Sequence, residues 1–335
     1  MSDFESLLDA IPKDPNVAFI LADYLEERGD PRCELLRLSY TLRDLEGNGS
    51  LVRRQLVDDG PGEANQPKTI FEITPERIAM EERLRELVLV EGLEPVIPQY
   101  TNEIGMEFVW IPPGKFLMGS PDDEPERYDN ETQHEVTLTK GFWLQTTTVT
   151  QQQWEQVMGN NSSRFRGENL PVEHVSWNDC ADFCQKVTEL TGRKTVLPTQ
   201  AQWEYACRAG TTSPFWFGKT ITTNQANYHG EYPYAGGEKG EFRDRTVVVK
   251  SFLPNGWGLY QMHGNVREWC HNWYDTKPTV DPEVDPKGPT KSGRRVLRGG
   301  SWANAATTCR SAVRHYRAPI KRDEHIGFRC AQVSE

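Results

Sequence analysis

From Asn102 to the C-terminus, short apolar runs alternate with clusters of Gly, Pro and Asn, and this texture limits the folds open to the chain. Runs such as EFVWIPPGKFLMGS and HEVTLTKGFWLQTTTVT are typical of short strands joined by irregular connections. The chain also has 10 Trp, 27 Gly and 22 Pro, a mixture that excludes a coiled coil, collagen and wholesale disorder. We therefore expect a loop-rich α+β domain, in which side chains satisfy many loop backbone groups.

Two longer helices are expected to interrupt this region. The first runs from about Asn178 to Thr191, where apolar residues recur on one face. The second is QAQWEYACRAG, with Thr199 as its N-cap and Gly210 as its stop. A helical turn is also expected in the REW segment that begins at Arg267.

The first hundred residues differ from the rest, because they have helical apolar spacing and no Trp. Residues 1–48 are expected to form a small all-helical domain, with one helix starting at Asp14-Pro15 and another running over Glu34–Leu45. Its segment LADYLEERGDPRCELLRL resembles the repeat-companion domain of planctomycete-type bacteria, which implies an interaction or packing module. Residues 49–100 are expected to be a linker, aperiodic at first, with one charged helix opened by Thr74-Pro75-Glu76.

Charge and hydropathy limit the partners and the compartment. There are 38 Lys+Arg against 49 Asp+Glu, a net charge of −11, which argues against nucleic acid because phosphate binding depends on neutralisation by Lys and Arg. No apolar run approaches the roughly 18 residues that a membrane span needs. The N-terminus MSDFESLLDA has acids where a signal peptide has a basic and then an apolar stretch. A cytoplasmic protein without nucleic-acid or membrane partners is expected.

Six motifs stand in order between Ile104 and Ala331: IGMEFVWIPPGKFLMGS, PVEHVSWNDCADFC, LPTQAQWEYACRAGT, NGWGLYQMHGNVREWC, RVLRGGSW and IGFRCA. This series resembles the formylglycine-generating enzyme (sulfatase-modifying factor) family of bacteria and other organisms. The resemblance implies that residues 101–335 have that family's C-type-lectin-like fold, with little regular secondary structure.

The resemblance also provides a test of activity. Enzymes of the family oxidise a substrate cysteine to formylglycine with two cysteines that hold copper, in a C-x4-C arrangement after Gly-Gly-Ser; thiolates suit Cu(I), a soft ion. Counted from Gly299-Gly300-Ser301, Asn304 stands at the first cysteine and Cys309 at the second. Counted back from the later RSAVR segment, Cys309 falls after the second one, since the chain is shorter there. Either count leaves no thiolate pair, so copper is not expected.

The other cysteines have structural positions by the same resemblance. It implies that Cys184 lies near Cys330 and that Cys207 lies near the region of Cys309, as thiols in a reducing compartment. Cys270 is expected to be a small buried apolar residue. None of the seven cysteines has the C-x2-C spacing of a zinc site.

Calcium is the cofactor that the resemblance leaves open. One site would draw oxygen ligands, which suit this hard cation, from Gln261, Gly264, Val266 and Glu268. A second would use Asn227, the carbonyl of Tyr228 and an acid near Glu241. Gln261 stands where the family usually has Asn or Asp, and its side chain is longer and neutral. The alternative is that hydrogen bonds close these loops without metal.

A ligand pocket is implied where the GNVREW, GGSW and GFRCA segments meet. Carried over by motif, its residues are Arg267, Ser301, Trp302, Asn304, Arg314 and His325. The family has an aromatic residue at position 267 and an amide at position 325, so this pocket is more cationic. An Arg fork suits carboxylate or phosphate, and a His can act as acid, base or metal ligand. The alternative is that Arg267 and Arg314 only brace loops.

Two functions fit these observations. The first is a binding or maturation module without catalysis, which contacts a protein or polar ligand through the 295–325 surface. The second is a metal-dependent oxidase or oxygenase that modifies a protein or small molecule with Cys309, His325 and Ser301. A Cys309 packed in the core near Cys207 favours the first function, and a Cys309 exposed beside His325 and Asn304 favours the second.

Overall fold

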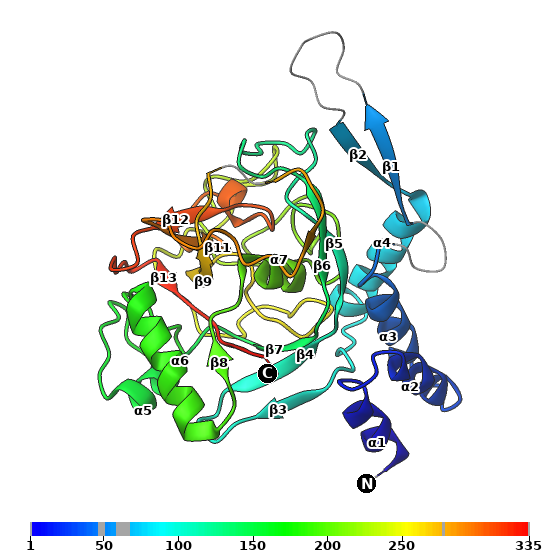
Figure 1. Ribbon diagram of the computed structural model, residues 1–335, viewed down its shortest axis with the longest axis horizontal. Coiled ribbons are helices and arrows are strands. Elements are labelled where there is room, and N and C mark those ends of the chain that lie inside the picture. The colour runs from blue at the N-terminus through cyan, green and yellow to red at the C-terminus, as the bar shows by residue number, and fades with distance from the viewer. Residues whose placement is uncertain (1, 46–50, 58–67, 277–278, 334–335) are drawn as a thin grey trace.

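The computed structural model describes residues 2–45, 51–57, 68–276 and 279–333 (Figure 1). The helices in these ranges are α1 (Asp3–Ala10), α2 (Val17–Glu26), α3 (Arg32–Thr41), α4 (Pro75–Leu89), α5 (Gln151–Met158), α6 (Trp177–Thr191), α7 (Gln200–Arg208) and the 3-10 helix η1 (Ala306–Cys309). The strands are β1 (Val52–Val57), β2 (Lys68–Ile73), β3 (Gln99–Thr101), β4 (Glu107–Ile111), β5 (Gly114–Met118), β6 (His134–Leu138), β7 (Phe142–Gln145), β8 (Thr195–Val196), β9 (Arg267–Trp273), β10 (Glu283–Val284), β11 (Arg295–Arg298), β12 (His315–Arg317), β13 (Ile326–Gly327) and β14 (Ala331–Gln332). No helix in these ranges is long and apolar enough to cross a bilayer.

The strands after residue 98 form three small sheets around α7, which lies near the middle of the molecule in Figure 1. Their strand orders are β3-β4-β7-β14-β8, β10-β6-β5 and β12-β11-β9-β13. Strands of two to seven residues joined by long connections account for the loop-rich texture of the sequence. The REW segment begins strand β9 rather than a helical turn, so that prediction was wrong; β9 pairs with both β11 and β13 and is buried between them.

Local signals set the ends of the helices in this region. Each of α5, α6 and α7 begins with a capping box. The side chain of the N-cap Thr or Ser accepts from the backbone N–H of the third helical residue, and the side chain of that third residue accepts from the backbone N–H of the N-cap residue. The two predicted helices are confirmed within one or two residues, as α6 and α7. Helix α5 was not predicted, because it has only eight residues and most of them are polar.

The N-terminal segment packs against the rest of the chain. Helix α2 begins at Val17, after Asn16, and not at Asp14-Pro15, because the Asp14 side chain accepts from the Asn16 N–H and holds a turn there. Helix α4 begins as predicted, with Thr74 as its N-cap. Part of the predicted linker is instead an antiparallel hairpin, β1–β2, that extends away from the other sheets (Figure 1); residues 58–67 of the linker lie outside the described ranges.

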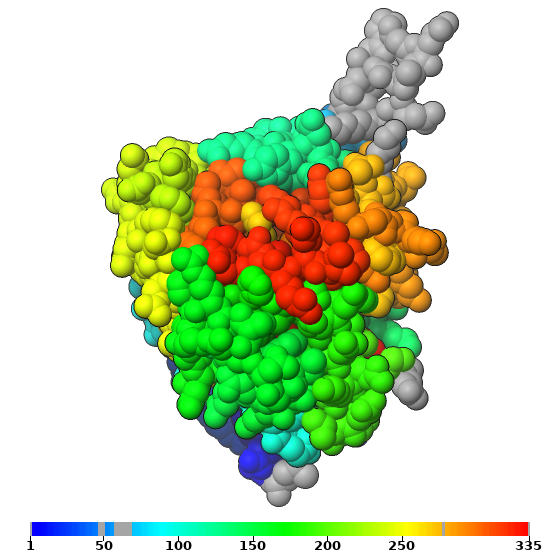
Figure 2. Space-filling view, turned by 90° about the vertical axis from the view of Figure 1, so that its left-hand side faces the viewer, coloured from blue at the N-terminus to red at the C-terminus, as the bar shows by residue number. Residues whose placement is uncertain are grey.

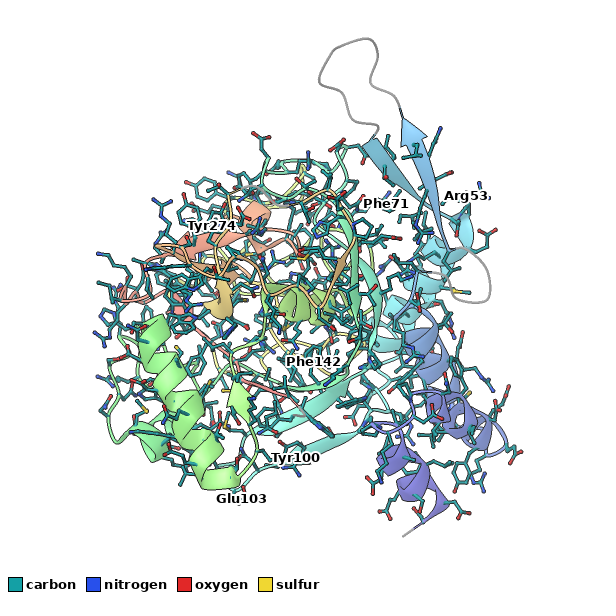
Figure 3. The ribbon with its side chains drawn as sticks, viewed as in Figure 1. Arg53, Phe71, Tyr100, Glu103, Phe142 and Tyr274 are labelled. Atoms are coloured by element: carbon teal, nitrogen blue, oxygen red, sulfur yellow. The ribbon has the colours of Figure 1, made fainter. Side chains whose placement is uncertain are left out.

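Large side chains and buried ion pairs fill the interior between the loops. Figure 3 shows side chains crowded inside the sheets, where Phe142 is 1% exposed. Buried arginines bind buried glutamates in four places. One pair, Arg77–Glu81, lies within α4, and three join distant segments: Arg298–Glu204, Arg310–Glu131 and Arg329–Glu268. A fold with so little regular structure needs such side chains, since buried loop carbonyls must find donors.

Candidate functional site

Five rings from four separate segments meet on one face and form what we call the aromatic cluster. Trp302 stacks on His325 with ring centroids 4.7 Å apart, and Phe165 meets Trp302 edge-on at 5.6 Å. Phe242 lies 6.2 Å from Trp302 and stacks on His229 at 3.7 Å. Figure 2 shows this face, with the last segment of the chain (red) between the 150–190 segment (green) and the 225–250 loops (yellow).

Sheet pairing places two of the expected pocket residues side by side. Strand β13 runs parallel to β9 with Ile326 opposite Arg267, and the Arg267 N–H donates to the His325 carbonyl at 2.8 Å. The His325 ring bonds through Nδ1 to the Asp323 carboxylate. That hydrogen bond lowers the pKa of Asp323 to about 2. Arg267 and His325 therefore lie together as the resemblance implied, and Asp323 is already engaged by His325.

The Arg267 side chain has no partner within the described part of the chain. It is half-buried, and its Nε is buried without a hydrogen bond. Burial is the largest cause that lowers the pKa of Arg267, and the charge of Arg317 adds to it. His315, on β12, likewise has a buried Nε2 without a partner. Burial, followed by the charges of Arg267 and Arg317, lowers the pKa of His315 to about 3.

Ser301 and Asn304 bind each other and a neighbouring loop. Ser301 Oγ donates to Asn304 Oδ1 at 2.8 Å, and the Asn304 carbonyl accepts from the His229 N–H at 2.8 Å. The Trp302 N–H donates to the Asn265 carbonyl at 3.0 Å. These bonds attach the GGSW segment to the aromatic cluster. The Asn304 side-chain oxygen is therefore already an acceptor for Ser301.

Cys309 lies in the core, not on the surface. It is 0% exposed, and burial raises the pKa of its thiol to about 12. Its Sγ lies 3.9 Å from the Ala305 carbonyl, and no second cysteine contacts it among the described residues. The core position expected for a structural Cys309 is found, and the exposed position expected for a catalytic one is not.

The neighbours of the other cysteines follow the expected pattern in part. Cys184 and Cys330 are free thiols with their sulfurs 3.8 Å apart, in the expected proximity. Cys207 faces the region of Cys309, but its contacts are Ser311 Oγ at 3.7 Å and the His263 ring at 3.7 Å. The side chain that meets Cys207 is thus a hydroxyl two residues beyond Cys309.

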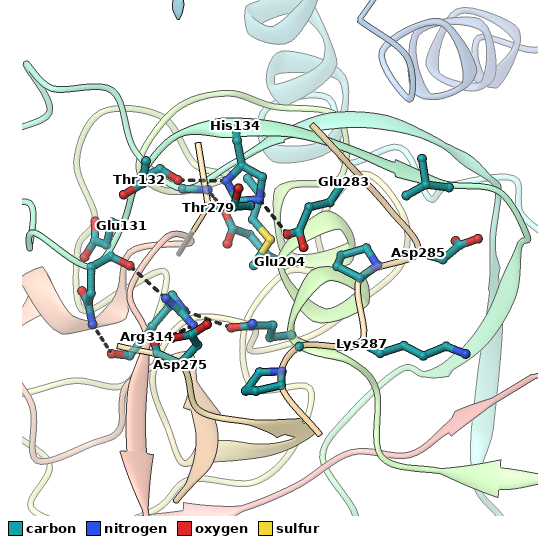
Figure 4. A pocket seen from close by; sticks show the side chains of 18 residues that line it. Glu131, Thr132, His134, Glu204, Asp275, Thr279, Glu283, Asp285, Lys287 and Arg314 are labelled. Carbon is teal, nitrogen blue, oxygen red and sulfur yellow. Dashed lines mark hydrogen bonds and ion pairs between the residues drawn. The ribbon is translucent and has the colours of Figure 1, made fainter. Parts of the chain in front are cut away.

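Arg314 lies apart from the other predicted pocket residues, which corrects the grouping made from motifs. It donates to Gln200 Oε1 and to the carbonyls of Asn130 and Asp275, at 3.0 to 3.3 Å. These bonds show the bracing role that was the alternative reading. Arg314 lines a cavity of about 610 Å³ with acids such as Glu283 (Figure 4), and no residue of the aromatic cluster lines it.

The first implied calcium segment has its ligand atoms already engaged. Both Glu268 oxygens accept from Arg329, and one also accepts from Trp203 Nε1. Gln261 Oε1 accepts from the Lys250 N–H, and its amide donates to the Val248 carbonyl. Gly264 and Val266 lie between them, buried. This donor set does not fit calcium, because its one carboxylate is neutralised by a buried arginine.

The second implied calcium segment keeps one free oxygen. Asn227 Nδ2 donates to the Arg245 carbonyl and to Asn265 Oδ1, while Asn227 Oδ1 is buried without a partner. The neighbouring residue is the buried Tyr228, and Glu241 pairs with Arg243 at the surface. No group of three or more His, Cys, Asp or Glu side chains in the described ranges converges as a metal site would.

Comparison with known proteins decides the family. The model described as "Sulfatase-modifying factor enzyme 1-like domain" matches residues 94–333. The chain belongs to this family. The match begins after the N-terminal helices, for which the repeat-companion assignment stays a prediction.

Relatives and a solved structure agree with this assignment. The formylglycine-generating enzyme of Mus musculus is 34% identical over 206 residues, 59% of this chain and 53% of the relative. A Mus musculus member named inactive C-alpha-formylglycine-generating enzyme 2 is 32% identical over 186 residues, 53% of this chain and 54% of the relative. PvdO from Pseudomonas aeruginosa has a TM-score of 0.62 at 27% identity, covering 72% of this chain and 100% of that one. The chain spans about half the length of the curated relatives it matches.

Proposed function

We propose that this member of the formylglycine-generating enzyme family is a ligand- or protein-binding module, or a maturation factor, that does not generate formylglycine. The observation that carries the proposal is the state of Cys309, a fully buried thiol with no second cysteine in contact. Two-coordinate copper needs a thiolate pair, and a raised pKa keeps this thiol protonated. The family itself includes a relative named inactive.

The aromatic cluster supports binding at the face built from the C-terminal segments. The rings of Trp302, His325 and Phe242 pack together there, with Trp302 4% exposed, and Arg267 adds a guanidinium without a partner among the described residues. Aromatic and Arg side chains are the types enriched where proteins bind partners strongly. The ligand supported best is therefore a polar or acidic one, held on the 295–325 surface.

The alternative, a metal-dependent oxidase or oxygenase, would need Cys309, His325 or Ser301 at the reacting atoms. His325 is bound to Asp323, and Ser301 to Asn304, and the described residues contain no group of three or more His, Cys, Asp or Glu side chains that could hold a metal ion. The observations favour binding over this alternative.

We expect the purified protein, supplied with Cu(I) and oxygen, to leave a Cys-Xaa-Pro-Xaa-Arg peptide unmodified. The physical reason is the missing thiolate pair. Mass spectrometry of the peptide measures the result, with the Mus musculus enzyme as the positive control. Aldehyde formation together with stoichiometric copper would overturn the proposal.

A second experiment tests the ligand class. Tryptophan fluorescence of the protein is expected to change saturably with tetraglutamate and not with tetralysine; equal responses to both peptides would contradict an acidic ligand.

Calcium is proposed only at the segment of Asn227, where a buried oxygen is free. After treatment with a chelator, added calcium is expected to raise the midpoint of thermal unfolding, because a ligand that binds only the folded state stabilises it. The Asn227→Ala variant is expected to lose that rise. Equal midpoints for the wild type with and without calcium would show that hydrogen bonds alone close the loop.

A further inference from the structure

Arg267 differs from the other deeply placed arginines of this fold. Arg298, Arg310 and Arg329 each donate to a buried carboxylate and to backbone carbonyls. The Arg267 guanidinium has no such acceptor anywhere in the described ranges, although its Nε is buried. A guanidinium carries five donors and no acceptor, and buried polar groups without partners are rare in folded proteins. An acceptor from outside the chain would complete this side chain.

The groups around Arg267 are cationic, and the carboxylate among them is already paired. Arg317 lowers the pKa of Arg267, and both arginines lower the pKa of His315, so the three groups share one region of positive potential. They belong to a single sheet, with Arg267 on β9 and the other two on β12. The carboxylate whose charge raises the pKa of Arg267 is Asp323, which already binds the His325 ring. Positive charge removed from water without a counter-charge is costly, and an anion would offset that cost.

We propose that Arg267, together with His315 and Arg317, forms a subsite for an oxyanion, carboxylate or phosphate, carried by the ligand of the aromatic cluster. The guanidinium fork matches two oxygens of such a group. The neutral His315 ring has a free buried Nε2 that can donate one more hydrogen bond. The Arg267 N–H donates to the carbonyl of His325, whose ring stacks on Trp302, so the subsite and the aromatic cluster adjoin through this pair of strands. The ligand class is thus an acidic group attached to a planar or apolar portion. This inference rests on the proposed binding function and names its ligand chemistry.

Inorganic phosphate tests the subsite directly. At constant ionic strength, phosphate is expected to raise the thermal midpoint of the wild type saturably, since it binds the folded state. Arg267→Gln is expected to lower the apparent affinity about tenfold or more, which corresponds to about 1.4 kcal/mol. Acetate, at matched ionic strength, distinguishes a carboxylate preference from a phosphate preference. Arg37→Gln is the matched control: this arginine lies on α3, outside the 295–325 surface, pairs with Asp23 and Glu26, and is expected to keep the full response.

The unliganded variants separate binding from bracing. If Arg267 only braced loops, Arg267→Gln would lower the midpoint in the absence of anion and Arg267→Lys would restore it. We expect instead that Arg267→Gln leaves the midpoint unchanged or higher without anion, because an unpaired desolvated charge is removed. Undiminished phosphate binding by Arg267→Gln would overturn the subsite. If phosphate does not bind but the response to tetraglutamate is retained, the subsite is wrong and the proposed binding function still holds. If the protein oxidises the peptide with copper, the proposed binding function is wrong whatever the result with phosphate.

Discussion

Replacing Arg77 with Met is expected to lower the free energy of unfolding by about 3–5 kcal/mol, the usual range when one partner of a buried ion pair is removed. Arg77 is 2% exposed and ion-pairs with Glu81, which is 3% exposed. The variant would leave the Glu81 carboxylate in the interior with one cationic neighbour fewer. Equilibrium denaturation by urea measures the change.

The size of this effect follows from where the Arg77 donors go. Its Nε donates to Glu81 within α4, and its Nη1 donates to the Asp44 carbonyl at 2.8 Å. Its Nη2 donates to the carbonyls of Leu42 and Gly210, at 3.0 and 2.7 Å. One side chain therefore joins the end of α3, helix α4 and the turn after α7. We expect Arg77→Met to make the N-terminal helices accessible to protease before the sheets unfold.

Two variants control for charge and for helix position. Arg83, on the same helix, ion-pairs with Glu34, Glu86 and Glu91, but at the surface, where water screens such pairs. Arg83→Met is therefore expected to cost far less, despite the larger number of pairs. Adding Glu81→Met to Arg77→Met is expected to recover part of the loss, because the double variant no longer buries a carboxylate that has lost its closest cation. A double variant no more stable than Arg77→Met would locate the effect in the carbonyl bonds alone.

The contacts of Arg77 also show what the sequence conveyed about the N-terminal region and what it did not. Apolar spacing and the Thr74-Pro75 cap predicted helices there, because these signals are local. The β1–β2 hairpin was taken for linker, since residues 49–72 contain Gly, Asn, Asp and Pro and have no regular apolar spacing. The sequence around Arg77 does not indicate that its side chain binds the carbonyl of Gly210, which is more than a hundred residues away.

The same contrast holds for the candidate site. Motifs placed Arg267, Trp302 and His325 together, because strand pairing in the family fold aligns their segments. They also grouped Arg314 with these residues, although its guanidinium binds carbonyls in a separate cavity. Phe165, His229 and Phe242 were not predicted. They come from loops without periodicity, where position depends on tertiary packing, and the clustering of aromatic residues in those loops was the only available signal.

Phe165 leads to the second large effect, which concerns Glu173. Glu173 is 0% exposed; its Oε1 accepts from the Phe165 N–H at 2.9 Å, and its Oε2 is buried without a partner. Burial raises the pKa of this carboxyl from 4.5 to about 7, against the opposing backbone hydrogen bonds of Phe165 and Arg164. Between these two pH values the folded state holds a proton that the unfolded state has lost. Stability from this group therefore falls as pH rises from 4.5 through 7.

We expect Glu173→Gln to stabilise the protein by up to about 3 kcal/mol at pH 8 and to have little effect near pH 5, since a tenfold change in proton affinity is worth about 1.4 kcal/mol. The neutral amide keeps an acceptor for Phe165 and cannot ionise. Urea denaturation of both proteins at intervals from pH 5 to pH 8 gives the difference in unfolding free energy, which is expected to grow with pH and level off above 7. Glu168→Gln, an exposed position on the same loop, is the matched control and is expected to show no such growth. A Glu173→Gln difference that is constant with pH would mean that the wild-type carboxyl does not titrate in this range. A growing difference would mean that this buried carboxyl, which accepts from the Phe165 N–H, destabilises the folded state when it ionises.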